Sequence, residues 1–186
     1  ISRRRLIESS IVGTAALAGA TSAFASKPVA KWDETVDIIV VGSGFAGLAA
    51  AIEAKNAGAN VIVLEKMAVF GGNSAINGGA FAVAGSPLQE KEGIKDSPEN
   101  HMKQTLAAGD FRGDPERVKV LCDNAYGAIT WLESLGMKFK DNVIQIFGAL
   151  YPRSHIPALP KGQGYGTVLT KAAKELGVQV HTGLGV

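Results

Sequence analysis

The feature that most constrains the fold is an apolar strand that runs into a glycine-rich turn, a helix and a second apolar strand ending in an acid. The first strand spans residues 36–41, the turn contains Gly42, Gly44 and Gly47, and the acid is Glu65. This order and spacing form the fingerprint of a dinucleotide-binding βαβ unit. A chance set of three glycines is the alternative, but it does not explain why the strands and the acid are in register.

Each part of the fingerprint has its own physical reason. We expect Gly42 to allow a tight turn, Gly44 to let the backbone approach a pyrophosphate, and Gly47 to let the helix lie close to the strand. The helix beginning at Phe45 offers N–H groups and the positive end of its dipole to phosphates. The Glu65 carboxylate is placed to accept hydrogen bonds from a ribose and would repel the 2′-phosphate of NADP. These features are equally consistent with FAD and NAD.

Residues 1–25 have the pattern of a targeting segment. A twin-arginine motif at residues 2–7 precedes a short, weakly apolar stretch at residues 11–20 and an A-x-A cleavage site at residues 23–25. This order predicts a twin-arginine signal peptide, export to the periplasm and a lead-in at residues 26–35. A retained membrane anchor is the alternative, but the stretch is too short and too rich in Gly, Thr and Ser to span about 30 Å.

The charge balance and the single cysteine exclude several classes of site. The formal charge is +2, but without the four charged residues of the targeting segment the chain has 16 basic and 16 acidic residues. We therefore expect no nucleic-acid surface. Cys122 is the only cysteine, which excludes an internal disulfide, a cysteine-rich zinc site and a C-x-x-C-H haem attachment.

After the lead-in, the hydrophobic pattern predicts an α/β domain with a parallel sheet and a helical insertion. The predicted strands are residues 36–41, 60–64 and 178–181. The predicted helices are residues 45–57, 97–108, 114–135 and 167–176, with the capping residues Ser97 and Asp114 before two of them. The remaining segments are predicted as loops at residues 86–97 and 148–163, a short hairpin at residues 137–147, and a glycine-dense segment at residues 67–85. That last segment fits a chain pressed against a ligand, with a mobile linker as the alternative.

The residues that follow the second strand carry a family resemblance. The sequence resembles the FAD domain of the fumarate reductase/succinate dehydrogenase flavoproteins, and most closely their soluble flavocytochrome c-type branch of fumarate and urocanate reductases. The segments that carry it are residues 42–48, Glu65-Lys66, residues 71–74, Gly78-Gly79, residues 96–99, Asp114-Pro115, residues 131–136 and residues 153–155. The resemblance covers residues 36–186.

The resemblance implies a Rossmann-like FAD-binding domain that is incomplete at its C-terminal end. It implies noncovalent FAD, because members with covalent flavin use a histidine in the loop corresponding to residues 71–79, and this sequence has none there. A capping domain and the catalytic residues are expected beyond Val186. The residues implied to bind the cofactor are Gly42, Gly44, Phe45, Ala46, Gly47, Glu65, Lys66, Gly72, Asn73, Ser74, Gly78, Gly79, Ala80 and Val186.

The implied reaction is reduction of the C=C bond of an unsaturated carboxylate, such as fumarate or urocanate, by hydride transfer from flavin N5. Because the chain has no haem motif, the electrons are expected from a separate c-type cytochrome. Gln145 and Ile146 stand where some fumarate reductases place methionines, which weakens the case for fumarate itself. A ketosteroid-type dehydrogenase and a non-catalytic electron relay remain as alternatives.

Arg153 and His155 are the two residues of the chain that invite a catalytic interpretation. They lie in a loop that the resemblance places near the flavin. We expect instead that Arg153 pairs with a structural carboxylate and that His155 caps or packs.

Overall fold

The structure is a computed structural model that describes residues 33–185. The predicted signal peptide, residues 26–32 of the lead-in and Val186 therefore lie outside the described residues. Residues 33–35 contain no helix or strand, and the folded unit begins at Val36.

A three-stranded parallel sheet confirms the predicted α/β class. Its strands are β1 (Ile38–Val41), β2 (Val61–Glu65) and β6 (Gln179–Thr182), in the order β1-β2-β6. The central strand β2 is almost wholly buried because it has a neighbour on each edge. By contrast, Ile39 and Val41 of the edge strand β1 are 57% and 65% exposed.

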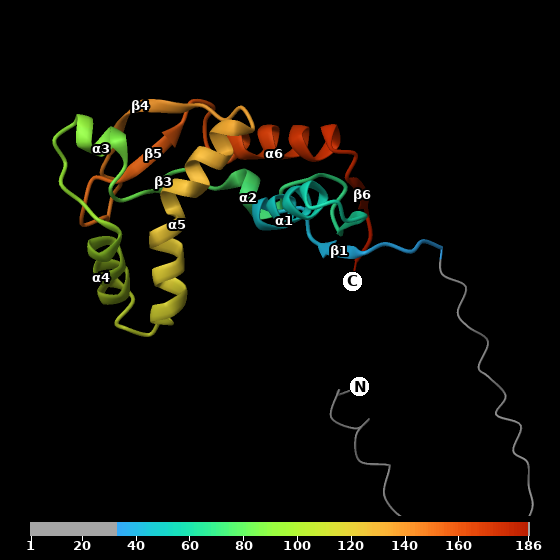
Figure 1. Cartoon of the computed structure of the whole chain (residues 1–186), viewed down its shortest axis with the longest axis horizontal. Helices are drawn as coiled ribbons and strands as arrows, with labels where there is room; N and C mark the ends of the chain where they lie inside the picture. Colours follow the sequence, from blue (N-terminus) through green and yellow to red (C-terminus); the bar gives the residue numbers. More distant parts are fainter. Residues whose placement is uncertain (1–32, 186) are drawn as a thin grey trace, which may run out of the picture. The chain divides into compact units, whose positions relative to one another are not determined.

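Two helices build the apolar core with this sheet (Figure 1). They are α1 (Phe45–Asn56) and α6 (Gln163–Glu175), which contact each other. The core they share with the sheet consists of Leu48, Ala51, Ile52, Val61, Val63, Leu132, Met137, Tyr165, Leu169, Ala172, Ala173 and Val178. The inward residues of α1 are spaced by three and four positions, as one face of a helix requires.

The segment between β2 and α6 contains four helices and a second, antiparallel sheet. The helices are α2 (Gly72–Ile76), α3 (Pro87–Lys91), α4 (Pro98–Ala108) and α5 (Pro115–Ser134). The sheet has the order β3-β5-β4, with β3 (Phe81–Ala82), β4 (Phe139–Ile144) and β5 (Ser154–Pro157). Figure 1 shows α4 and α5 side by side, and they are in contact.

Three sequence expectations in this insertion are wrong. Residues 137–147 contain the single strand β4 and do not form a hairpin. The partner of β4 is β5, which lies where a loop was expected. Residues 86–97 are not all loop, because α3 begins there with the Ser86 hydroxyl accepting from Gln89 N at 3.2 Å and with Pro87 in its first turn. The strand β5 is stabilised by neighbours that are distant in sequence, so the pattern of four residues did not reveal it.

The predicted starts of α4 and α5 are confirmed, whereas α6 begins at Gln163, before the predicted residue 167. The Ser97 hydroxyl accepts from Asn100 N at 3.1 Å, and the Asp114 carboxylate accepts from Glu116 N at 3.0 Å. Both caps precede a proline that needs no hydrogen-bond acceptor at the first helical position.

Apolar residues at helical spacing form the buried face of α5. Its buried residues are Cys122, Ala125, Ile129 and Leu132. Leu121, in the first half of the helix, is 59% exposed.

The third fingerprint glycine is required by a close approach of helix and strand. A Cβ on Gly47 would lie 2.0 Å from the carbonyl oxygen of Gly42 and 3.3 Å from the Val40 side chain. No side chain fits there unless the turn moves.

We expect Gly47→Ala to destabilise the protein by about 3 kcal/mol, because the clash is with backbone and cannot relax by rotation of a side chain. Gly127→Ala is the matched control. Gly127 lies on the exposed side of α5, and a Cβ there meets nothing within 4 Å. The free energy of unfolding of this control should rise by about 0.5–1 kcal/mol, because Ala has a higher helix propensity than Gly. Urea unfolding measures both, and equal midpoints for Gly47→Ala and wild type would contradict the close approach.

Candidate functional site

The first turn leaves the N-terminus of α1 open to an external acceptor. Gly42 has a φ of +92°, which suits glycine, and Gly44 is the N-cap without any capping side chain. The N–H of Phe45 donates to the Ser74 hydroxyl at 3.3 Å. In the described part of the chain, the N–H groups of Ala46 and Gly47 have no acceptor. An uncapped helix N-terminus with free N–H groups is a seat for phosphate.

Glu65 is tied to this turn through Ser43. The side chain is buried, and its Oε2 accepts from the backbone N of Ser43 at 2.8 Å and from the Ser43 hydroxyl at 2.6 Å. Its Oε1 accepts from Met67 N at 2.8 Å. The Ser43 hydroxyl, followed by these backbone hydrogen bonds, lowers the pKa of Glu65 from 4.5 to about 2. The carboxylate is therefore ionised at neutral pH and adjacent to the first turn.

The glycine-dense segment is held against protein backbone. Gly71 N donates to both the carbonyl and the hydroxyl oxygen of Ser43, each at 3.1 Å. Farther along, Gly162 N donates to the Asn77 carbonyl at 3.0 Å, and a Cβ on Gly162 would lie 2.1 Å from the Ser74 carbonyl oxygen. These contacts argue against a linker, while contact of the segment with a ligand stays a prediction.

The predicted cofactor residues line two hollows. The first has a volume of about 640 Å³ and is lined at the ends of β1 and β2 and along α2 by Gly42, Glu65, Lys66, Gly72 and Asn73, among others. The second has about 350 Å³ and includes Phe45, Ala46, Gly79 and Ala80 in its wall. Both volumes fall within the range of small-molecule sites.

The remaining predicted residues lie between or outside these hollows. Ser74 connects the two, because its hydroxyl bonds to Phe45 while its neighbours Asn73 and Ala75 line the first hollow. Gly44, Gly47 and Gly78 line neither hollow, and Val186 lies outside the described residues.

Two residues of the site, Ser43 and Tyr165, were not predicted from the sequence. Ser43 is fully buried between two fingerprint glycines, and a hydroxyl so close to the required acid was a usable signal. The Tyr165 hydroxyl donates to the Gly79 carbonyl at 2.9 Å, and its ring lies 4.8 Å from that of Phe45. Burial raises the pKa of Tyr165 to about 12, so the hydroxyl remains a donor. No local pattern predicts a contact between residues so far apart in sequence.

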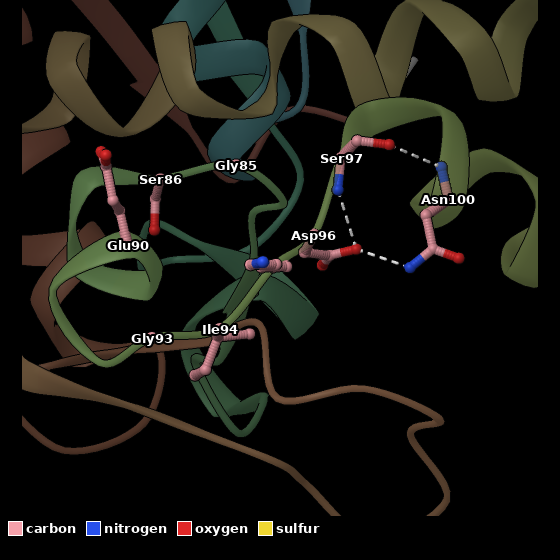
Figure 2. A pocket seen from close by; sticks show the side chains of 9 residues that line it. Gly85, Ser86, Glu90, Gly93, Ile94, Asp96, Ser97 and Asn100 are labelled. Atoms are coloured by element: carbon pink, nitrogen blue, oxygen red, sulfur yellow. Dashed lines mark hydrogen bonds between the residues drawn. The ribbon is translucent and has the colours of Figure 1, made fainter.

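Arg153 is a structural residue, as expected. Its guanidinium pairs with both oxygens of Asp96, at 2.9 Å and 3.0 Å, and the Asp96 side chain is fully buried. Figure 2 shows Asp96 accepting also from Ser97 N and the Asn100 side chain. Burial acts to raise the pKa of Asp96, but the hydrogen bonds, first that of Arg153, outweigh it and hold the pKa below its usual value.

His155 has two protein partners and is likewise structural. Its Nε2 lies 3.0 Å from the Ser86 hydroxyl, and its Nδ1 lies 3.1 Å from the Arg153 carbonyl oxygen. Burial lowers the pKa of His155, which favours the neutral ring. The interpretation of Arg153 and His155 as pairing and packing groups is confirmed.

A third hollow, of about 670 Å³, lies over this polar cluster (Figure 2). Its lining includes Ser86, Asp96, Ser97 and Asn100, whose side chains are committed to one another, to Arg153 or to His155. We therefore locate the candidate site at the first turn. Within residues 33–185, no group of three metal-ligating side chains occurs, and no helix is long and apolar enough to cross a membrane.

We expect Arg153→Met to destabilise the protein by about 3–5 kcal/mol, because it leaves the buried Asp96 carboxylate without a counter-charge. The double variant Asp96→Asn/Arg153→Met should lose less than the single one. Arg112→Met is the control, because Arg112 and its partner Asp110 are both largely exposed, and it should change stability by less than about 0.5 kcal/mol.

Chemical denaturation measures these differences, and its pH dependence adds a second check. Because the pKa of folded Asp96 lies below 3.8, its contribution is complete above that pH and is lost as the pH falls further. Equal stability of Arg153→Met and Arg112→Met would contradict the role of the buried pair.

The chain is similar in sequence and fold to known oxidoreductases. The acrylate reductase flavoprotein subunit of Shewanella woodyi is 40% identical over 152 residues, which is 81% of this chain and 30% of that protein. The open conformation of a flavocytochrome c3 fumarate reductase has a TM-score of 0.75 at 35% identity, covering 81% of this chain and 27% of that one. The 3-ketosteroid-Δ4-(5α)-dehydrogenase of Rhodococcus jostii RHA1 has a TM-score of 0.74 at 32% identity, covering 84% and 39%.

The chain thus spans less than half the length of each of these proteins. The resemblance to reductase flavoproteins is confirmed, and residues 37–184 match the family described as FAD binding domain. The chain therefore belongs to the FAD-binding domain family of flavoprotein oxidoreductases.

Proposed function

We propose that this chain is part of an FAD-dependent reductase that acts on the C=C bond of a small unsaturated carboxylate, such as fumarate, acrylate or urocanate. The observation that carries the proposal is the open N-terminus of α1 beside the ionised Glu65, in a chain 40% identical to an acrylate reductase subunit. Bound FAD, once reduced by an electron donor, would supply the hydride for such a reduction.

The residues of the site fit this cofactor. The free N–H groups of Ala46 and Gly47 suit the pyrophosphate, and Glu65 in the 640 Å³ hollow suits a ribose hydroxyl. The remaining predicted residues from Gly72 to Ala80 continue from this hollow to the 350 Å³ hollow. No histidine occurs among residues 71–80, which supports noncovalent binding.

We further propose that the groups that capture the substrate carboxylate and deliver the proton lie outside residues 33–185. Arg153 is unsuited to this role because its guanidinium is committed to Asp96. The 350 Å³ hollow is walled mainly by apolar and aromatic residues, including Phe81, Trp131 and Leu132, and carries no cationic group.

We also propose the compartment and the electron donor of the protein. The twin-arginine motif and A-x-A site support export to the periplasm in folded form. We propose a c-type cytochrome as the electron donor, which is the partner that the resemblance to flavocytochrome c-type reductases implies.

The test uses the full-length purified protein. We expect a yellow protein whose chromophore is released by acid, is bleached by a chemical reductant without oxygen, and is reoxidised by fumarate, acrylate or urocanate. Absorbance at the flavin band follows each step. A colourless protein that binds NADH would refute the cofactor, and a flavin that no unsaturated carboxylate reoxidises would refute the reaction.

A ketosteroid dehydrogenase is the second candidate, favoured by the TM-score of 0.74 to such an enzyme. Its test runs in the opposite direction, since a saturated ketosteroid should then bleach the oxidised flavin. An electron-relay protein is the third candidate, and its flavin should respond to neither substrate class.

A further inference from the structure

We infer that Ser43 is a positioning residue for the cofactor, acting through Glu65 by fixing which carboxylate oxygen faces the 640 Å³ hollow. The inference rests on the proposed binding of FAD at this turn. Ser43 itself lines neither hollow and is fully buried, so any effect on the cofactor passes through its neighbours.

Ser43 makes contacts with two other segments of the chain. It donates twice to Glu65 at the end of β2, through its backbone N–H and its hydroxyl. Its carbonyl and hydroxyl oxygens both accept from Gly71 N, which is the N-cap of α2. One side chain therefore connects the first turn, the acid and the start of the glycine-dense segment.

These hydrogen bonds determine how many acceptor positions of the Glu65 carboxylate remain for a ligand. A carboxylate has about four acceptor positions, two on each oxygen. Both positions on Oε2 are taken by Ser43, and one on Oε1 is taken by Met67 N. A single position on Oε1 remains, which suits one hydroxyl of a ribose and does not suit a bidentate contact.

Removing the hydroxyl should loosen this arrangement without breaking the fold. In Ser43→Ala the backbone N–H still donates to Glu65, and Gly71 N still has the Ser43 carbonyl oxygen. Glu65 loses the contact that contributes most to its lowered pKa, so the pKa should move upward toward 4.5. The carboxylate is then free to turn Oε2 toward the hollow.

The experiment is a double-mutant cycle on the full-length protein. The FAD dissociation constant is measured by flavin fluorescence for wild type, Ser43→Ala, Glu65→Gln and the double variant. We expect Ser43→Ala to weaken FAD binding about tenfold at pH 7. This corresponds to the loss of about one hydrogen bond between the ribose and the charged Glu65. In the Glu65→Gln background the same change should alter binding less than about twofold.

A pH series separates positioning from a structural effect. Wild-type affinity should stay level down to about pH 4, because the pKa of Glu65 is about 2. The affinity of Ser43→Ala should begin to fall at a higher pH, because its carboxylate protonates earlier. Ser134→Ala is the matched control, since Ser134 is exposed and bonds to the Trp131 carbonyl at the end of α5. It should match wild type at every pH.

The outcomes separate this inference from the proposed function. A wild-type protein that binds no FAD overturns both. If wild type binds FAD, the inference alone is overturned by unchanged binding in Ser43→Ala, by an equal loss in the Glu65→Gln background, or by pH profiles that coincide with wild type.

Discussion

The hydrogen bonds between Ser43 and Glu65 are the interaction on which the site depends. They join the turn after β1 to the end of β2, so that Gly42 of the turn and the acid line the same hollow. Close packing makes this possible, because Gly47 lets α1 approach the turn to a distance that no Cβ would allow. Gly71 then attaches to Ser43, which places the start of the glycine-dense segment on the same point. The site is therefore built mainly from main-chain contacts and one buried polar pair.

A second buried polar cluster fixes the insertion. The apolar cluster specific to that region is small, with Val83, Ala125 and Ile129 as its buried residues. Asp96 and Arg153 provide a connection between distant segments that this small core does not provide. Their two short hydrogen bonds join the start of α4 to β5. Buried ion pairs contribute little net stability when replaced as a unit, but they strongly penalise any arrangement that separates them. We therefore regard the pair as specifying where β5 lies more than as adding stability.

The sequence alone predicted the elements that depend on signals between neighbouring residues. The strands β1 and β2, the helix α1 and the caps Ser97 and Asp114 depend on residues a few positions apart, and each was predicted close to its observed place. The second sheet was missed because β5 consists of four residues stabilised by β3 and β4. The same reason applies to the site, where the contact of Tyr165 with Gly79 joins residues 86 positions apart. Packing between distant segments leaves no periodic trace in either of them.

The described residues suit the binding of a cofactor better than the capture of a substrate carboxylate. An arginine that captures a substrate carboxylate must have free N–H groups facing the substrate. Arg153 would have to release Asp96 to do so, which would leave a buried carboxylate unpaired. The open turn and the two hollows instead present free backbone N–H groups, one ionised acid and apolar walls, which suit a dinucleotide and its rings. The proposed reductase and the alternative dehydrogenase both fit such a domain, so the residues that bind the substrate are what would distinguish them.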